Sequence, residues 1–110
     1  MDGMQPIENW LNVCDLDEIP VRGARRFRTS SGEIAVFRTS GEEVYAIDNQ
    51  CPHKKGPLSE GIVHDSAVTC PLHNWVIDLQ SGKARGADSG CVKTYPTKLA
   101  EGRVLVKTSL

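Results

Sequence analysis

Short runs of branched and aromatic residues alternate with turn residues along most of this chain. Three such runs, at residues 25–29, 33–39 and 43–48, are separated by Ser30-Ser31-Gly32 and Ser40-Gly41-Glu42. Alternation of apolar and polar side chains is typical of strands with one buried face, and Gly and Ser between such runs are typical of tight turns. The pattern predicts an antiparallel meander.

A second group of strands is expected further along the chain. Residues 67–70 and 74–78 have strand character and precede a turn at Gln80-Ser81-Gly82. Residues 93–99 alternate and can pair with residues 103–107 across Ala100-Glu101-Gly102, which predicts a final hairpin.

Helical periodicity is weak throughout. Residues 15–19 can form a single turn that Pro20 ends, but no segment sustains a 3.6-residue apolar period. With 110 residues the chain can build one core, so the many short strands predict a single all-β domain of the sandwich or small-barrel type. Residues 49–61 fit neither strand nor helix, and a loop of this length in a compact domain is usually functional.

Composition and charge narrow the classes of protein that the chain can be. Apolar residues make up 39% of it and charged residues 25%, and its formal net charge is -1 at pH 7. Such a chain has no overall attraction to nucleic acid or anionic lipid, so neither is expected as a partner. No apolar stretch typical of a secretory signal opens the sequence, and polar residues follow Arg25-Arg26 where an export signal needs apolar ones. We expect a cytoplasmic protein.

Two segments each carry a cysteine closely followed by a histidine. They are Cys51-Pro52-His53 and Cys70-Pro71-Leu72-His73, with residues 54–69 between them. Each segment follows a predicted strand, and the proline after each cysteine fixes the backbone and leaves neighbouring amides free to donate. In a reducing compartment, cysteines are more naturally metal ligands or buried thiols than disulfides. The pattern predicts a metal site built from two loops, about residues 49–61 and 70–75.

Two metal chemistries suit two cysteines and two histidines. In a Rieske [2Fe-2S] cluster, one iron takes two thiolates and the other takes two imidazoles. Tetrahedral zinc takes the same residues, but zinc fingers usually draw both cysteines from one short segment and both histidines from another. Here each segment supplies one of each. This favours the cluster and leaves a zinc-stabilised β interaction module, without a redox role, as an alternative.

At these residues the sequence resembles the Rieske family, and the motif is highly specific. The resemblance implies that Cys51, His53, Cys70 and His73 bind one [2Fe-2S] cluster per chain, and that the protein transfers electrons. It also implies that residues 1–110 form a single Rieske domain, a Rieske-type antiparallel sandwich or small barrel of three sheets with a cluster-binding subdomain. Nothing resembles a phosphate-binding glycine loop or a nucleophile with its base, so we expect no catalytic site of its own.

Residues around the ligands resemble one branch of this family in particular, the small subunit of the cytoplasmic NAD(P)H-dependent nitrite reductase. The similarity covers residues 10–106 and includes 51–54, 56–59, 61–63, 70–75, Gly86-Ala87-Asp88 and Gly90-Cys91-Val92. It implies an accessory electron-transfer subunit in nitrate assimilation. Its partner would be a large subunit that carries flavin, an iron-sulfur centre and sirohaem and reduces nitrite to ammonium. Lys55 departs from the glycine expected after Lys54. The alternative is a Rieske ferredoxin of a ring-hydroxylating dioxygenase system.

Four other residues invite a chemical role. Trp75 lies close to His73, where an indole can cover a cluster, but ordinary burial of a strand aromatic explains it equally well. His64 precedes a turn and has no cysteine beside it, so we interpret it as a surface histidine. Cys14 and Cys91 belong to no ligand pair, and we expect both to be buried free thiols.

The residues after the ligands set an expectation for the reduction potential. High-potential relatives carry an extra cysteine in each ligand loop, and the two form a disulfide that shields the cluster. Here Lys54-Lys55-Gly56 follows His53 and Asn74-Trp75 follows His73, so that disulfide cannot form. The resemblance therefore implies a potential at the low, ferredoxin-like end of the Rieske range. Protein-film voltammetry should find it there, and a clearly positive potential would contradict this prediction.

Overall fold

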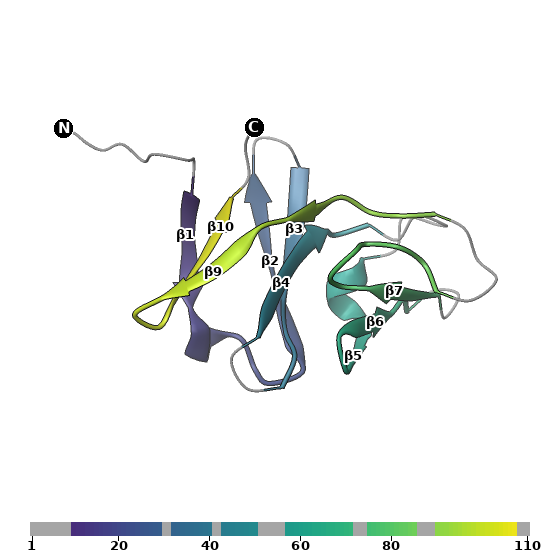
Figure 1. Cartoon of the computed structure of the whole chain (residues 1–110), viewed down its shortest axis with the longest axis horizontal. Helices are drawn as coiled ribbons and strands as arrows, with labels where there is room; N and C mark the ends of the chain where they lie inside the picture. The colour runs from purple at the N-terminus through teal and green to yellow at the C-terminus, as the bar shows by residue number, and fades with distance from the viewer. Residues whose placement is uncertain are drawn as a thin grey trace.

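Three antiparallel sheets make up the computed structural model, which describes residues 10–29, 32–40, 43–50, 57–71, 75–85 and 90–107 (Figure 1). The first sheet, of order β1-β10-β9, consists of β1 (Trp10–Asp15), β10 (Arg103–Lys107) and β9 (Thr97–Ala100). The second, of order β2-β3-β4-β8, consists of β2 (Gly23–Thr29), β3 (Gly32–Arg38), β4 (Val44–Asp48) and β8 (Thr94–Tyr95). The third and smaller sheet, of order β5-β6-β7, consists of β5 (Ile62–His64), β6 (Ala67–Thr69) and β7 (Val76–Asp78).

Two short 3₁₀ turns complete the described elements, η1 (Leu16–Glu18) and η2 (Leu58–Glu60). The turn η1 stands where a single helical turn was expected, and its carbonyl at Leu16 accepts a hydrogen bond from the Ile19 N–H at 3.0 Å. Within the described ranges, no helical segment is long and apolar enough to cross a membrane. The predicted all-β architecture of three sheets is confirmed.

The predicted meander is also confirmed. β2 and β3 pair in register from Gly23↔Arg38 to Thr29↔Gly32, and β3 and β4 continue the ladder as far as Ile34↔Asp48. The strands expected over residues 67–70 and 74–78 are present as β6 and β7, which form an antiparallel hairpin.

The predicted final hairpin is confirmed for β9 and β10, but residues 93–99 do not form a single strand. The chain divides at Pro96, so that β8 pairs with β4 while β9 pairs with β10. Proline has no N–H to donate to a ladder, which makes it a natural point for the chain to leave one sheet and enter another. The sequence pattern does not predict β1, β5 or η2. β1 and β5 lie at sheet edges, and η2 lies inside the segment interpreted as loop.

The middle sheet separates two hydrophobic cores. Four consecutive residues of β3, at positions 34–37, have no exposed surface, because alternate side chains point to opposite faces and both faces are covered. Ala35 and Phe37 pack into the core shared with the small sheet, together with Leu58, Val68, Cys70 and Ile77. Ile34 and Val36 pack into the other core, together with Ile19, Val104 and Val106. The small sheet is therefore fixed to the centre of the domain through β3.

Gly61 joins η2 to β5 at a point where β6 leaves no space for a side chain. A Cβ atom there would lie 2.3 Å from the Thr69 carbonyl oxygen and 2.9 Å from Cγ2 of Val68. Gly61→Ala should therefore lower the free energy of unfolding by about 1–3 kcal/mol, the usual cost of forcing extra atoms into packed structure. Chemical denaturation measures the change.

The neighbouring substitution Ile62→Ala serves as the control for this prediction. The Ile62 side chain is 70% exposed, so its removal should change the free energy of unfolding by less than about 0.5 kcal/mol. If Gly61→Ala were as stable as the unchanged protein, the close approach of β6 to Gly61 would not be a constraint on the fold.

Candidate metal centre

Cys70 is the predicted ligand that the structure describes, and Cys51, His53 and His73 lie outside the described residues. Cys70 directly follows β6, has no exposed surface, and packs in the core shared by β3 and the small sheet. It is a free thiol. In the described ranges, no three His, Cys, Asp or Glu side chains gather as a metal ion would require. The residues that flank the two loops show how each loop is held.

The second loop is closed by a backbone hydrogen bond. The Cys70 N–H donates to the Trp75 carbonyl at 2.7 Å, one step beyond the last β6–β7 pair, Thr69↔Val76. The end of the hairpin therefore determines where the loop begins and ends. Trp75 is half-buried and packs against the core around Cys70, as expected for ordinary burial of a strand aromatic. Its contact with a cluster stays a prediction.

The first loop leaves β4 through two residues that are held by their neighbours. Asp48 accepts a hydrogen bond of 2.5 Å from the Tyr95 hydroxyl, and its N–H donates to the Lys93 carbonyl at 3.0 Å. Burial, together with the Asp48 carboxylate, raises the pKa of Tyr95 far above its usual range. Asn49 is 3% exposed and makes hydrogen bonds through its backbone and its side-chain amide.

A ribbon formed by residues 82–85 and 90–92 extends the small sheet beyond β7. The Arg85 N–H donates to the Val76 carbonyl at 2.8 Å, and the Val92 N–H donates to the Gly82 carbonyl at 2.8 Å. Arg85 also forms an ion pair of 2.8 Å with Asp78. The hydrogen bond from the Arg85 guanidinium is the main reason that the pKa of Asp78 lies below its usual value. These contacts tie the ribbon to β7, the strand that follows the second loop.

The residues outside the motif differ in how well they were predicted. Cys14 is buried, as expected, and burial raises the pKa of its thiol. The expectation for Cys91 was wrong, since its side chain is exposed. Cys91 pairs with Lys83 across the ribbon, and alternation along the chain turns its neighbour Val92 inward. His64 is half-buried rather than fully exposed, with Nε2 2.7 Å from the Thr69 hydroxyl.

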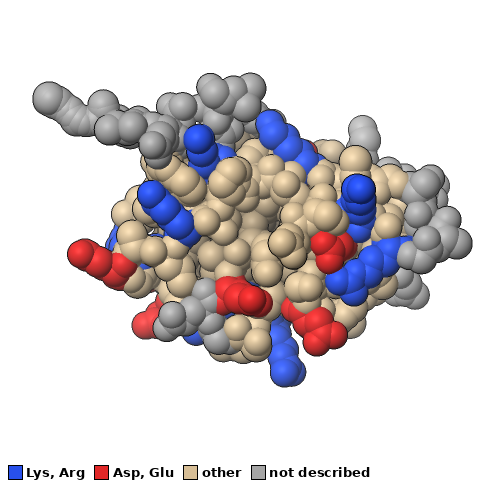
Figure 2. Space-filling view, viewed as in Figure 1, with Lys and Arg blue, Asp and Glu red and all other residues tan. Residues whose placement is uncertain are grey.

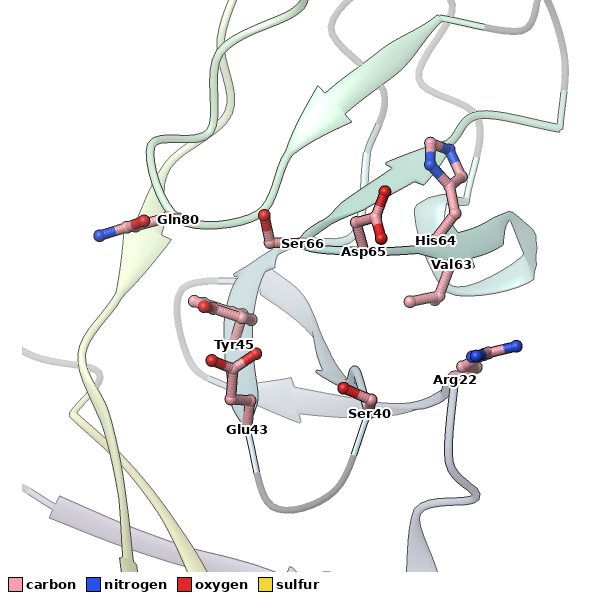
Figure 3. A pocket seen from close by; sticks show the side chains of 9 residues that line it. All are labelled: Arg22, Ser40, Glu43, Tyr45, Val63, His64, Asp65, Ser66 and Gln80. Atoms are coloured by element: carbon pink, nitrogen blue, oxygen red, sulfur yellow. The ribbon is translucent and has the colours of Figure 1, made fainter.

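A polar groove of about 660 Å³ lies between the turn after β5 and the start of β4 (Figure 3). Asp65 and Ser66 lie on one side of it and Glu43 and Tyr45 on the other, as Figure 3 shows. Its lining consists of Arg22, Ser40, Glu43, Tyr45, Val63, His64, Asp65, Ser66 and Gln80. Cys70 is not among these residues. No local sequence pattern indicates this groove, because its lining residues come from four separate segments.

Charged side chains do not gather by sign on the described surface that Figure 2 shows. Acidic and basic groups are interspersed across this face, in agreement with the small net charge of the chain. The geometry around the loops is therefore the more informative guide to function.

Comparison with known proteins identifies the family to which this geometry belongs. Residues 9–107 match the model of the Rieske-like [2Fe-2S] domain. The chain belongs to the Rieske-like [2Fe-2S] family. It is an electron-transfer protein of this family, and its cofactor is a [2Fe-2S] cluster. This finding sets aside the zinc-stabilised module. The thiol and imidazole groups of the motif are the donor set that such a cluster requires, and Cys70 is present as a free thiol.

Individual Rieske relatives include ferredoxin components of dioxygenase systems and subunits of nitrite reductases. A ferredoxin component of naphthalene 1,2-dioxygenase/salicylate 5-hydroxylase systems from a Ralstonia species is 35% identical, over 91% of this chain and 96% of that protein. A nitrite reductase [NAD(P)H] large subunit from Klebsiella oxytoca is 34% identical over 92% of this chain but only 11% of its own length. A crystal structure described as an NADH-dependent nitrite reductase small subunit, from Mycobacterium tuberculosis, is 27% identical. It superposes with a TM-score of 0.82 over 92% of this chain and 96% of that one.

Proposed function

We propose that this Rieske protein is the small subunit of a cytoplasmic NAD(P)H-dependent nitrite reductase. The observation that carries the proposal is its similarity to nitrite reductase chains in both sequence and structure. The residues Gly86-Ala87-Asp88 and Gly90-Cys91-Val92, which resemble that branch of the family, add support. Its partner would be a large subunit that carries flavin, an iron-sulfur centre and sirohaem and reduces nitrite to ammonium.

The proposed ligands are the thiolates of Cys51 and Cys70 and the imidazoles of His53 and His73. When bound, the cluster supplies one-electron chemistry, and neutral imidazoles make its reduction easier than in an all-cysteine site. The chain's own residues fix the segments beside the ligands, through the Cys70 N–H bond to the Trp75 carbonyl at the end of the β6–β7 hairpin and through the hydrogen bonds of Asn49 after β4. Nitrite itself would be reduced on the large subunit.

A second candidate is the ferredoxin component of an aromatic-ring dioxygenase system. The identity of 35% to the Ralstonia protein over nearly the full length of both chains favours it. The two candidates share the cluster and its ligands and differ in the protein that receives the electron. They are therefore distinguished by the partner and not by the fold.

The ligand assignment predicts opposite outcomes for two histidines. His73→Ala should abolish cluster binding, because one iron loses a ligand. His64→Ala should keep the cluster and lose one side-chain hydrogen bond, worth about 0.5–1.5 kcal/mol. Iron and sulfide content, visible absorption and EPR of the reduced protein measure the cluster. A His73→Ala protein with a full cluster would contradict the assignment.

The partner is tested by supplying the chain to each candidate system. Co-purification with the large subunit of a sirohaem-containing nitrite reductase should succeed, and NAD(P)H oxidation that depends on nitrite should increase several-fold when the chain is added. A naphthalene dioxygenase with its ferredoxin omitted is the parallel assay. If the chain restored oxygenase turnover and left nitrite reduction unchanged, the ferredoxin function would replace the proposed one.

A further inference from the structure

Asn49 connects three separate parts of the structure beside the first ligand loop. Its N–H donates to the Glu33 carbonyl at 3.0 Å, which extends the β3–β4 ladder one residue beyond the pair Ile34↔Asp48. Its side-chain Nδ2 donates to Oε1 of Glu33 at 2.9 Å. Its Oδ1 accepts a hydrogen bond of 2.7 Å from the Ser59 N–H. Both ends of the side-chain amide are therefore used.

Ser59 belongs to η2, which lies near the end of the first loop segment, beyond the predicted ligands Cys51 and His53. The first N–H groups of a helical turn have no partner within the turn, and a side chain from outside must accept from them. Pro57, at the cap position, makes no side-chain hydrogen bond to the turn. Asn49, at the start of the loop segment, provides the acceptor for the Ser59 N–H instead. Leu58 of the same turn is fully buried in the core, so η2 offers a fixed anchor.

We propose that Asn49 is a positioning residue for the cluster, because it joins the two ends of the first ligand loop and attaches both to Glu33 of β3. This inference rests on the proposed assignment of Cys51 and His53 as ligands. Closing a loop at its base restricts the conformations open to the residues within it, which favours the one that binds. Asn49 touches no predicted ligand in the described residues and acts through the backbone that carries Cys51.

The geometry requires an amide at this position. An aspartate at position 49 can still accept from the Ser59 N–H, but it cannot donate to Glu33 and places a second carboxylate 2.9 Å from Oε1. With only 3% of Asn49 exposed, solvent screens this repulsion poorly. Replacing Glu33 with glutamine restores a donor that faces the new carboxylate. The pair can therefore be exchanged with its hydrogen bond kept.

The experiment compares Asn49→Asp, Glu33→Gln and the double variant with the unchanged holoprotein. The rate of cluster loss, followed by visible absorption in the presence of an iron chelator, should rise about tenfold in Asn49→Asp, equivalent to about 1.4 kcal/mol. The double variant should return to within about twofold of the unchanged protein. Glu33→Gln alone keeps an acceptor for Nδ2 and should behave as the unchanged protein does.

Asn12→Asp is the matched control. The Asn12 Oδ1 also accepts a side-chain hydrogen bond, from Nε of Arg103 at 3.0 Å, but in the sheet on the far side of β3 from the ligand loops. It should leave cluster loss unchanged. An Asn49→Asp protein that kept its cluster normally would overturn the proposal, as would faster loss that Glu33→Gln did not reverse.

Hydrogen exchange of the Ser59 amide separates this inference from the ligand assignment. In apoprotein, from which the cluster has been removed, repulsion between the new carboxylate of Asn49→Asp and Glu33 should displace the side chain and weaken its bond to the Ser59 N–H. Protection of that amide should therefore fall in Asn49→Asp and return in the double variant, whatever the ligands are. Loss of protection together with an unchanged rate of cluster loss would overturn the positioning role. A cluster that survived replacement of Cys51 or His53 would overturn the assignment, while the exchange data would still report the link between Asn49 and Ser59.

Discussion

The complete burial of β3 is the constraint on which the rest of this structure depends. A strand with both faces covered must supply apolar side chains at consecutive positions, and β3 does so from Ile34 to Phe37. Its two faces serve different cores, one shared with the first sheet and one shared with the small sheet. A change at one of these positions is felt in only one core directly, but it shifts the strand that both cores share.

The small sheet illustrates how a minimal scaffold can carry a cofactor. Its three strands have three residues each, and its buried side chains Val63, Val68 and Ile77 belong to the core that it shares with β3. Leu58, in the turn η2, and Cys70, directly after β6, pack in the same core as Phe37. Residues beside both ligand loops are therefore packed in the same hydrophobic core.

Polar groups determine where each loop begins and ends. Along the second loop the closing contact is a backbone bond between Cys70 and Trp75, whereas along the first it is the side chain of Asn49. Backbone closure follows from any hairpin, but side-chain closure depends on one residue type. This difference makes the first loop more sensitive to substitution at its base. In a Rieske protein, where the ligands set the potential, such sensitivity matters for electron transfer.

The sequence alone determined the parts of this protein that depend on neighbours along the chain. The meander follows from alternation and from turn residues only a few positions apart, and the paired cysteines and histidines are recognisable because each pair lies within one short segment. Only the tertiary structure decided the rest. It placed Cys91 on the surface, divided the strand at Pro96 between two sheets, and brought Asn49 against Glu33 and Ser59. Each of these outcomes is set by residues that are distant in the chain, and no local pattern carries that information.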